Sequence, residues 1–573
     1  GRKLWSRDCA SWGWGIEPDL FATDGLVWVW GRGESPLLGL DPDTGEVVRK
    51  RPEFRTFGIN HHHRCYRNKA TSRFMLTSWR GLECIPWKES GDGSYTHWWF
   101  RAGCRHGFVP SNGLIYNSPN PCVCYLDAKL GGINALAPSR PAPDGHTSVP
   151  DAARLQKGDA YPASPEPPDE DAESWPAYRH DIYRSSSTPS ASPAAPEKEW
   201  SARLGSQPTP AVTGGDRVYV SVPEKLVVRA FDAEQGGRLW SFTPGARVYT
   251  PPTYYRGYLV FGSADGYVYC LRADDGRLAW KFLAARGRRR VMKEGRLESA
   301  WPVHSSVIVQ DGRAYVTAGR STFLDGGVQG WVLDVKTGEI LDRRRWDTTD
   351  IEPDDEGVTV RRKASRPGFA SDIPVSDGSS IYVKDRGLFE NVLQDGPERP
   401  LIRPRSSFLD ATWYNRASQW RVGGELHGEQ VAVGPDRVFA FAAYDTAEGR
   451  STNDSYIMPG TGAFRLYSRP LSGKESANHS GWARDIRIGV KAMAAASSHL
   501  VVGGWPDRVP EDDPWKYIEG RGSGRLLVLS TEDGETRSEL QLPAPPVLDG
   551  IAVSAGRIYV STQDGRLLCL GEE

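Results

Sequence analysis

The stretch GSADGYVYCLRADDGRLAWKF, residues 262–282, decides the fold of this chain of 573 residues. It contains a Gly/Asp turn, a strand, a second turn of the form ADDG, and a further strand that carries Trp280. Short strands rich in aromatic and β-branched residues, separated by such turns, are typical of antiparallel hairpins. The stretch therefore predicts one unit of a repeated β-structure.

Copies of this unit recur along the chain. They are LDPDTGEVVRKR at 40–51, FDAEQGGRLWSF at 231–242, LDVKTGEILDRR at 333–344 and LSTEDGETRSEL at 529–540. Because each such unit buries its faces against its neighbours, the pattern predicts an all-β fold, a β-propeller of four-stranded blades. Ten candidate hairpins, some of which could be accessory, predict eight to ten blades: 23–30, 72–79, 111–117, 214–222, 255–262, 310–319, 376–384, 434–441, 497–504 and 554–562.

The two ends of the chain predict how the propeller closes. The last residues, STQDGRLLCLGEE, supply the third strand of a blade but no fourth. The first residues, GRKLWSRD, resemble the fourth strands GRLAWKF and GRLWSF. We therefore expect the N-terminal strand to complete the last blade and to remove an open sheet edge. The alternative is that Gly1 is a boundary and that the preceding blade lies outside this sequence.

Residues 139–196 interrupt the repeat. They are rich in Pro, Ser, Asp and Glu, a composition that predicts a linker on the surface. Within them, WPAYRHDIYRSS at 175–186 has Trp175 and Tyr178 as anchors. The expected organisation is a first group of blades at 1–138, the linker insertion at 139–196, and the remaining blades at 197–573.

The charge of the chain is balanced. Lys and Arg number 71, Asp and Glu 72, and the net charge is −1. This balance gives no reason to expect a nucleic acid or an anionic membrane as partner. No apolar run approaches the roughly 18 residues of a membrane-spanning helix. The chain starts without Met, so we expect a mature protein, or an excised part of a longer one, in a periplasmic or secreted location.

The motif at 265–280 carries a resemblance to a known family. Its pattern, DG-x-[VL]-Y-x-L-x-x-x-x-G-x-[LV]-x-W, resembles the quinoprotein alcohol dehydrogenase-like propeller superfamily, whose repeats are called PQQ-like. Stretches such as LESAWPVHSSVIV and SSFLDATWYNR are similar to large, uncharacterised PQQ-like repeat proteins typical of planctomycete bacteria. The resemblance implies a propeller fold.

For the alcohol dehydrogenases of this superfamily, the resemblance implies a quinone under a vicinal Cys–Cys disulfide and a calcium held by carboxylate and Asn ligands. The sequence has no Cys-Cys pair, and its nearest element is Cys122-Val-Cys124. It also lacks the C-x-x-C-H motif of haem c attachment. These absences argue against PQQ as a cofactor.

Four of the eight cysteines lie within 60 residues of one another: Cys65, Cys104, Cys122 and Cys124. A Cys-x-Cys pair in a strand places both thiols on one face, and structural zinc takes four such ligands. These residues are candidate ligands of a structural zinc, with disulfides such as Cys65–Cys104 or buried free thiols as alternatives.

The other four cysteines fall outside this group. Cys9 and Cys84 could form a separate pair. Cys270 and Cys569 lie in repeat strands, where we expect them in the core.

The stretch NHHHRCYRNKAT at 60–71 is the densest polar cluster. Neutral imidazoles beside cationic groups are candidate bases. The candidate catalytic residues are His62, His63, Tyr66 and Arg67, and the candidate substrate-binding residues are Arg64, Lys69 and His97. The alternative is a crowded polar turn.

Two later clusters have a similar chemistry. The first cluster combines ESAWPVHSSV at 298–307 with AGRSTFLDGG at 318–327, and the second is FLDATWYNRASQW at 408–420. In a propeller, the loops that enter the innermost strands converge on one face, where rings and Arg side chains could bind a sugar or polyanion. The catalytic candidates are His304, Tyr414 and Arg416, and the binding candidates are Trp301, Arg320, Asp325, Asp410 and Trp413. The alternative is ordinary stapling of the blades.

Three functions are consistent with these residues. The leading hypothesis is a polysaccharide lyase-like enzyme that acts on a uronate-containing, anionic glycan. Such an elimination needs a cation (Arg67 or Arg416), a base (His63 or His304) and an acid (Tyr66 or Tyr414). The second hypothesis is a non-catalytic propeller scaffold that binds a protein or glycan, and the third is a quinoprotein dehydrogenase.

Overall fold

The structure is a computed structural model. It describes residues 1–9, 19–30, 37–51, 67–78, 81–88, 95–97, 100–103, 106–118, 133–138, 148–162, 173–347, 368–384, 386–390, 399–404, 420–423, 426–442, 464–471, 481–508, 510–517 and 519–572. The chain forms two compact units, unit 1 at 1–142, 350–370 and 409–417, and unit 2 over the remainder. Among the described residues, no helix has the length and apolar character needed to cross a membrane.

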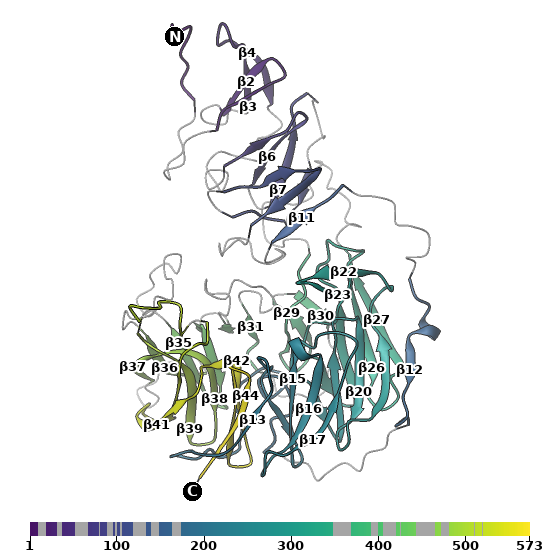
Figure 1. The fold of residues 1–573 in the computed structure, drawn as a ribbon, viewed down its shortest axis with the longest axis vertical. Coiled ribbons are helices and arrows are strands. Elements are labelled where there is room, and N and C mark those ends of the chain that lie inside the picture. The colour runs from purple at the N-terminus through teal and green to yellow at the C-terminus, as the bar shows by residue number, and fades with distance from the viewer. Residues whose placement is uncertain are drawn as a thin grey trace. The chain divides into compact units, whose positions relative to one another are not determined.

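Three antiparallel sheets are formed by the part of unit 1 that the structure describes (Figure 1). The first holds β1 Phe21–Thr23, β2 Leu26–Trp30, β3 Leu37–Leu40 and β4 Val47–Arg51. The second holds β5 Lys69–Ala70, β6 Phe74–Ser78, β7 Leu82–Pro86 and β8 Tyr95–His97, and the third β9 Val109–Ser111, β10 Leu114–Asn117 and β11 Asn134–Leu136. Trp28 and Trp87 pack together in the core of the first two sheets, with ring centroids 5.1 Å apart.

The described residues of unit 2 form eight sheets of three or more strands. Four follow one another along the chain: β14 Val212–Gly214, β15 Arg217–Val222, β16 Val227–Asp232 and β17 Arg238–Phe242; β18 Thr253–Tyr255, β19 Tyr258–Gly262, β20 Tyr267–Arg272 and β21 Leu278–Leu283, with β12 Leu155–Lys157 added beyond β21; β24 Ile308–Gln310, β25 Arg313–Ala318, β26 Val328–Asp334 and β27 Ile340–Trp346; β28 Pro374–Ser376, β29 Ile381–Val383 and β30 Arg386–Phe389.

The other four sheets complete unit 2. They are β31 Ile402–Pro404, β32 Trp420–Val422 and β33 Leu426–Gly428; β34 Gln430–Val433, β35 Arg437–Ala442, β36 Arg465–Pro470 and β37 Trp482–Asp485; β38 Ile488–Ala495, β39 His499–Pro506, β40 Gly524–Ser530 and β41 Thr536–Leu542; β42 Pro546–Ser554, β43 Arg557–Thr562, β44 Arg566–Gly571 and β13 Glu197–Arg203. A separate hairpin, β22 Arg290–Lys293 and β23 Arg296–Ser299, precedes β24.

The first strands of neighbouring sheets contact one another. Contacts join β14 with β18, β18 with β24, β28 with β31, β34 with β38, β38 with β42, and β42 with β14. Sheets whose innermost strands meet in this way radiate from a common axis, which is the arrangement of propeller blades. The predicted all-β propeller fold is confirmed.

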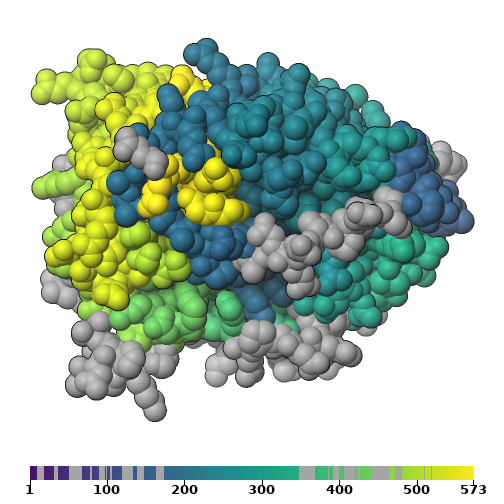
Figure 2. All heavy atoms as spheres, turned by 90° about the horizontal axis from the view of Figure 1, so that it is seen from below, coloured from purple at the N-terminus to yellow at the C-terminus, as the bar shows by residue number. Residues whose placement is uncertain are grey.

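The strand that completes the last blade differs from the prediction. β13 pairs with β44 along its whole length, from Glu197↔Gly571 to Arg203↔Arg566. Figure 2 shows the yellow C-terminal part of the chain against blue residues of the range that includes β13. The prediction that residues 1–8 occupy this position is therefore wrong. The sequence misleads because EKEWSAR and GRKLWSR both carry the Trp of an outer strand.

The Trp of an outer strand packs on the Gly turn of the next sheet. The ring of Trp240 lies over Gly276, and its Nε1 donates to the carbonyl of Ala273 at 2.9 Å. A Cβ at Gly276 would lie 2.5 Å from the ring, and the glycine has a φ of +71°. The same contact recurs for Trp5 on Gly45, Trp200 on Gly236, Trp280 on Gly338 and Trp482 on Gly534. This contact explains why the repeat combines a Trp with a turn that ends in Gly.

Residues 173–192, called the axial segment below, run along the innermost strands of unit 2. Backbone N–H groups of Thr213, Tyr254, Ser376, Val433 and Ala495 donate to its carbonyls. These residues belong to or flank the first strands β14, β18, β28, β34 and β38 of five different blades. The segment thus satisfies backbone groups that would otherwise face the axis.

Candidate functional site

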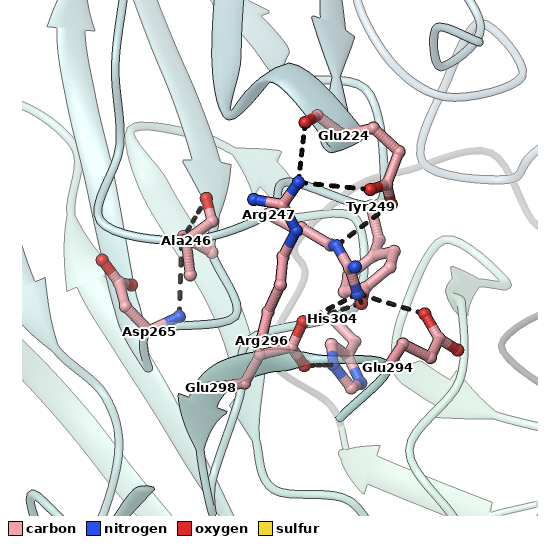
Figure 3. Close-up of polar contacts among 10 residues, drawn as sticks. Glu224, Ala246, Arg247, Tyr249, Asp265, Glu294, Arg296, Glu298 and His304 are labelled. Atoms are coloured by element: carbon pink, nitrogen blue, oxygen red, sulfur yellow. Dashed lines mark hydrogen bonds and ion pairs between the residues drawn. The ribbon is translucent and has the colours of Figure 1, made fainter. Parts of the chain in front are cut away.

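A cluster of charged and aromatic side chains lies where the β17–β18 connection meets the β22–β23 hairpin (Figure 3). Arg247 and Tyr249 come from that connection, and Glu294, Arg296 and Glu298 come from the hairpin. Glu224 lies in a short 3₁₀ turn after β15, and His304 lies between β23 and β24. Connections from two blades and one hairpin therefore build the cluster.

Arg247 is the buried centre of this cluster. Its side chain is 4% exposed and forms ion pairs with Glu224 at 3.1 Å, Glu294 at 3.1 Å and Glu298 at 3.5 Å. It also donates to the Tyr249 hydroxyl at 3.0 Å. Buried charges are stable only when they are paired, so the three carboxylates account for the presence of this guanidinium.

Glu298 links the tyrosine to the histidine. The Tyr249 hydroxyl donates to Glu298 Oε1 at 2.8 Å, and His304 Nε2 lies 3.8 Å from Glu298 Oε2. Burial works against the carboxylate, but its contacts with His304 and Tyr249 and the charge of Lys293 hold the pKa of Glu298 below its usual range. Burial raises the pKa of Tyr249. At neutral pH the pair is a carboxylate and a protonated phenol.

His304 is buried, with 7% of its surface exposed. Its ring meets Tyr249 edge-on, with centroids 5.0 Å apart. Burial lowers the pKa of His304 to about 4, although the neighbouring Glu298 acts in the opposite direction. An imidazole with this pKa is neutral at pH 7 and is a weak base.

The other predicted residues of this blade form a second group. Arg320 donates to Asp325 at 2.7 Å, and Arg289 forms an ion pair with the other oxygen of the same carboxylate. Trp301 Nε1 donates to the Asp325 carbonyl at 2.9 Å, and Arg289 lies over the Trp301 ring at 5.4 Å. The structure thus brings Trp301, Arg320 and Asp325 together, and the charges of Arg320 and Asp325 are paired within the protein.

Three further predicted residues lie in unit 1. Arg67 is exposed and pairs with Asp19 at 3.3 Å, and Lys69 lies on β5. His97 ends β8, and burial lowers the pKa of its imidazole.

Most of the predicted site lies outside the described residues. This applies to His62, His63, Arg64, Tyr66, Asp410, Trp413, Tyr414 and Arg416, and to the candidate zinc ligands Cys65, Cys104, Cys122 and Cys124. Within the described ranges, no three His, Cys, Asp or Glu side chains gather as metal ligands.

The four cysteines that the structure describes, Cys9, Cys84, Cys270 and Cys569, form no disulfide with one another. Cys9 and Cys84 are not joined, so the pairing suggested for them is wrong. Cys84 lies on β7 in the first unit's core, whereas Cys9 is the last described residue of the N-terminal segment 1–9. Cys270 and Cys569 are fully buried in the core, as predicted.

The axial segment decides whether the cofactor implied by the resemblance fits. Arg179 and Arg184 are fully buried and donate to carbonyls of Val431 in β34 and Pro374 in β28, which belong to two different blades. Tyr178 and Arg179 both donate to Asp549, at 2.5 and 2.6 Å. A planar quinone needs an open cavity, and in the described part of the axis the chain's own side chains occupy that space. The described residues therefore do not fit PQQ.

Sequence reasoning missed the centre of the charged cluster. Arg247, Tyr249 and Glu224 lie in connections without any repeat signature, and nothing in the sequence marks them. Glu298 is the first residue of the stretch ESAWPVHSSV and precedes Trp301 by three residues. Its closeness to His304 in the sequence could therefore have identified it as a candidate site residue.

Comparisons with known proteins agree with the repeat. Residues 186–386 match the family described as outer membrane protein assembly factor BamB. No curated protein matches the chain. Among solved structures, quinohaemoprotein alcohol dehydrogenase from Comamonas testosteroni is 12% identical, with 70% of this chain and 81% of that chain covered and a TM-score of 0.41.

Two other solved structures are similar. BamB from Moraxella catarrhalis is 11% identical, with 66% of this chain and 100% of that chain covered and a TM-score of 0.31. A europium-containing methanol dehydrogenase is 11% identical, with 70% and 99% covered and a TM-score of 0.40.

Proposed function

We propose that this chain, in which residues 186–386 match a PQQ-like repeat family, is a non-catalytic scaffold that binds a partner protein. We place it in the periplasm or outside the cell. The observation that carries the proposal is the axial segment, which fills the described part of the axis with the chain's own buried side chains. A propeller filled in this way presents its connections and outer strands for binding.

The family match supports a protein partner. The matched family is described as an assembly factor, and the match covers the blades that surround the charged cluster. By analogy with that description, we infer that this chain holds another protein through its surface.

The chemistry of the described cluster supports binding over elimination. A lyase base must reach a sugar carbon, and His304 is buried behind Tyr249 and Glu298. A lyase also needs a cation free to neutralise a uronate, and both Arg247 and Arg320 are paired with carboxylates of the protein. A quinoprotein dehydrogenase would need a cavity for its cofactor.

One set of assays separates the three functions. The purified chain is incubated with PQQ and calcium and tested for dye-linked oxidation of alcohols. It is then incubated with anionic polysaccharides and followed by the ultraviolet absorbance of unsaturated uronate. We expect neither signal from the folded protein. Turnover with PQQ, or a uronate product that is lost in His304→Gln and Tyr249→Phe, would overturn the proposal.

A positive test identifies the partner. Cross-linking in the cell envelope fraction, followed by mass spectrometry, is expected to join this chain to a defined protein at a fixed ratio. Tyr249→Phe and His304→Gln should retain that cross-link as long as they stay folded. Cross-links that spread over many proteins without a fixed ratio would contradict a dedicated scaffold.

A further inference from the structure

The β22–β23 hairpin has two faces of different chemistry. In its register Val291 pairs with Glu298, Met292 with Leu297, and Lys293 with Arg296. Directly opposite residues point to the same side of a hairpin, and successive residues alternate. Val291, Lys293, Arg296 and Glu298 therefore share one face, and Arg290, Met292 and Leu297 share the other.

The first face is held against the propeller. The Lys293 ammonium lies 4.6 Å from the Tyr249 ring centroid, Arg296 donates to the Glu224 carbonyl at 3.1 Å, and Glu298 accepts from Tyr249. Glu294, in the tight turn at the tip, pairs with Arg247. These contacts of the charged cluster (Figure 3) orient the hairpin and neutralise both of its carboxylates.

The second face carries an exposed apolar pair. Met292 is 67% exposed and its cross-strand partner Leu297 is 57% exposed. Residues 294 and 295 form the turn with φ of +48° and +74°, so the hairpin ends in a two-residue tip beside this pair. Two large apolar side chains at a tip form a small protrusion and not a groove.

Unpaired cations flank the apolar pair. Arg288 and Arg290 are exposed and form no ion pair with any described residue. The segment from Ala285 to Arg296 contains six basic residues and one acidic residue. The balanced charge of the whole chain conceals this local excess, which favours an anionic partner.

We propose that the β22–β23 hairpin docks on the surface of an anionic lipid bilayer. Met292 and Leu297 would enter the interfacial layer while Arg288 and Arg290 contact lipid phosphates. A convex apolar tip suits a soft surface that closes around it, whereas a folded acidic protein would need a complementary pocket. The inference goes beyond the proposed scaffold function, because it concerns binding to a lipid bilayer and not to the partner protein.

Flotation with vesicles tests this docking. The full chain is mixed with vesicles of phosphatidylcholine alone, or of an equimolar mixture with phosphatidylglycerol. We expect the protein to float only with the anionic vesicles, and added salt to release it because salt screens the attraction. Since one cation near such a surface strengthens binding roughly fivefold, Arg288→Gln/Arg290→Gln should weaken it by at least about tenfold.

Two further variants make the test specific. Met292→Ser/Leu297→Ser should weaken partitioning by about tenfold, because it removes the apolar contact and keeps the charges. Leu239→Ser/Leu341→Ser, which changes exposed leucines on outer strands, should float like the wild type. Unchanged thermal unfolding shows that each variant is folded.

The opposite results are equally clear. A wild type that stays with the pellet, or hairpin variants that float normally, would overturn the proposal. So would loss of a cross-linked acidic protein in the hairpin variants without any vesicle binding, since the face would then be a protein interface. The vesicle assay contains no partner protein, so its failure leaves the scaffold function standing.

Discussion

At the scale of single residues, the Trp–Gly contact is the device that joins neighbouring blades. The indole covers the Gly turn of the next sheet and donates to a carbonyl inside that turn. Any side chain at this glycine would need space that the ring fills, and the positive φ adds strain for an L-residue. Two independent costs therefore act at the same position.

We predict that Gly236→Ala lowers the free energy of unfolding by about 1–3 kcal/mol. A Cβ there would lie 2.5 Å from the Trp200 ring, and the residue has a φ of +72°. The neighbouring Gly237→Ala is the matched control, because nothing lies within 4 Å of its Cβ. Urea unfolding of both variants checks this, and an equal loss in both would contradict the contact's role.

The second prediction at this scale concerns acid stability. Burial lowers the pKa of His304 from 6.5 to about 4. Between pH 6.5 and pH 4, this histidine is therefore protonated in the unfolded chain but neutral in the folded chain. Stability therefore falls as the pH falls from about 6.5 to about 4, by about 3 kcal/mol for this group. Glu298, Lys293 and Arg320 surround the imidazole, and the lowered pKa of Glu298 changes stability in the same direction.

His304→Gln should make the free energy of unfolding less dependent on pH across this window. Urea unfolding of wild type and variant at a series of pH values measures the two slopes. Parallel slopes for wild type and His304→Gln would show that His304 does not titrate as described.

At the scale of elements, the axial segment holds unit 2 together from the inside. Arg179, His180, Arg184 and Ser186 have positive φ although none is glycine. Such backbone is costly and persists only where the surroundings enforce it. Here the enforcing contacts are the hydrogen bonds to innermost strands and the buried pair of Arg179 with Asp549, whose side chains are 0% and 1% exposed.

We predict that Asp549→Asn destabilises the protein by about 3 kcal/mol or more, because it leaves the Arg179 charge buried without a counter-charge. Asp159→Asn breaks the exposed pair with Arg277 and should cost less than about 1 kcal/mol. Hydrogen exchange of residues 173–192 should also rise in Asp549→Asn. Protection equal to that of the wild type would mean that other contacts hold the segment.

At the scale of the whole molecule, unit 2 is completed by β13. This strand is separated from its partner β44 by more than half of the chain, and the pairing joins the first blade strand of unit 2 to its last. A sheet completed by a distant segment has no open edge at that position and links the two ends of the repeat.

We predict that cysteines placed at the paired positions Arg203 and Arg566 form a disulfide on mild oxidation, which peptide mapping detects. Lys3→Cys combined with Arg566→Cys should give no such cross-link, because β13 occupies the edge of β44. A cross-link from position 3 would show instead that the N-terminal segment completes the blade.

The sequence by itself determined the fold class. Alternating strands and turns that end in Gly recur, and each copy carries the local preferences for its own strands and turns, so LDVKTGEILDRR predicts β26 and β27 without knowledge of the rest. It also predicted that Cys270 and Cys569 are core residues, because alternation assigns them to a buried face. Local physics suffices for such features.

Only the tertiary structure decided which outer strand closes the last blade and which side chains surround His304. Residues 1–8 and 197–203 have similar patterns, so pairing with β44 depends on where the intervening chain places each segment. Arg247 reaches Glu298 from a connection with no motif, across 51 residues of sequence. Such contacts are set by the arrangement of whole blades, since ion pairs and strand edges are satisfied by whichever partner the fold brings within reach.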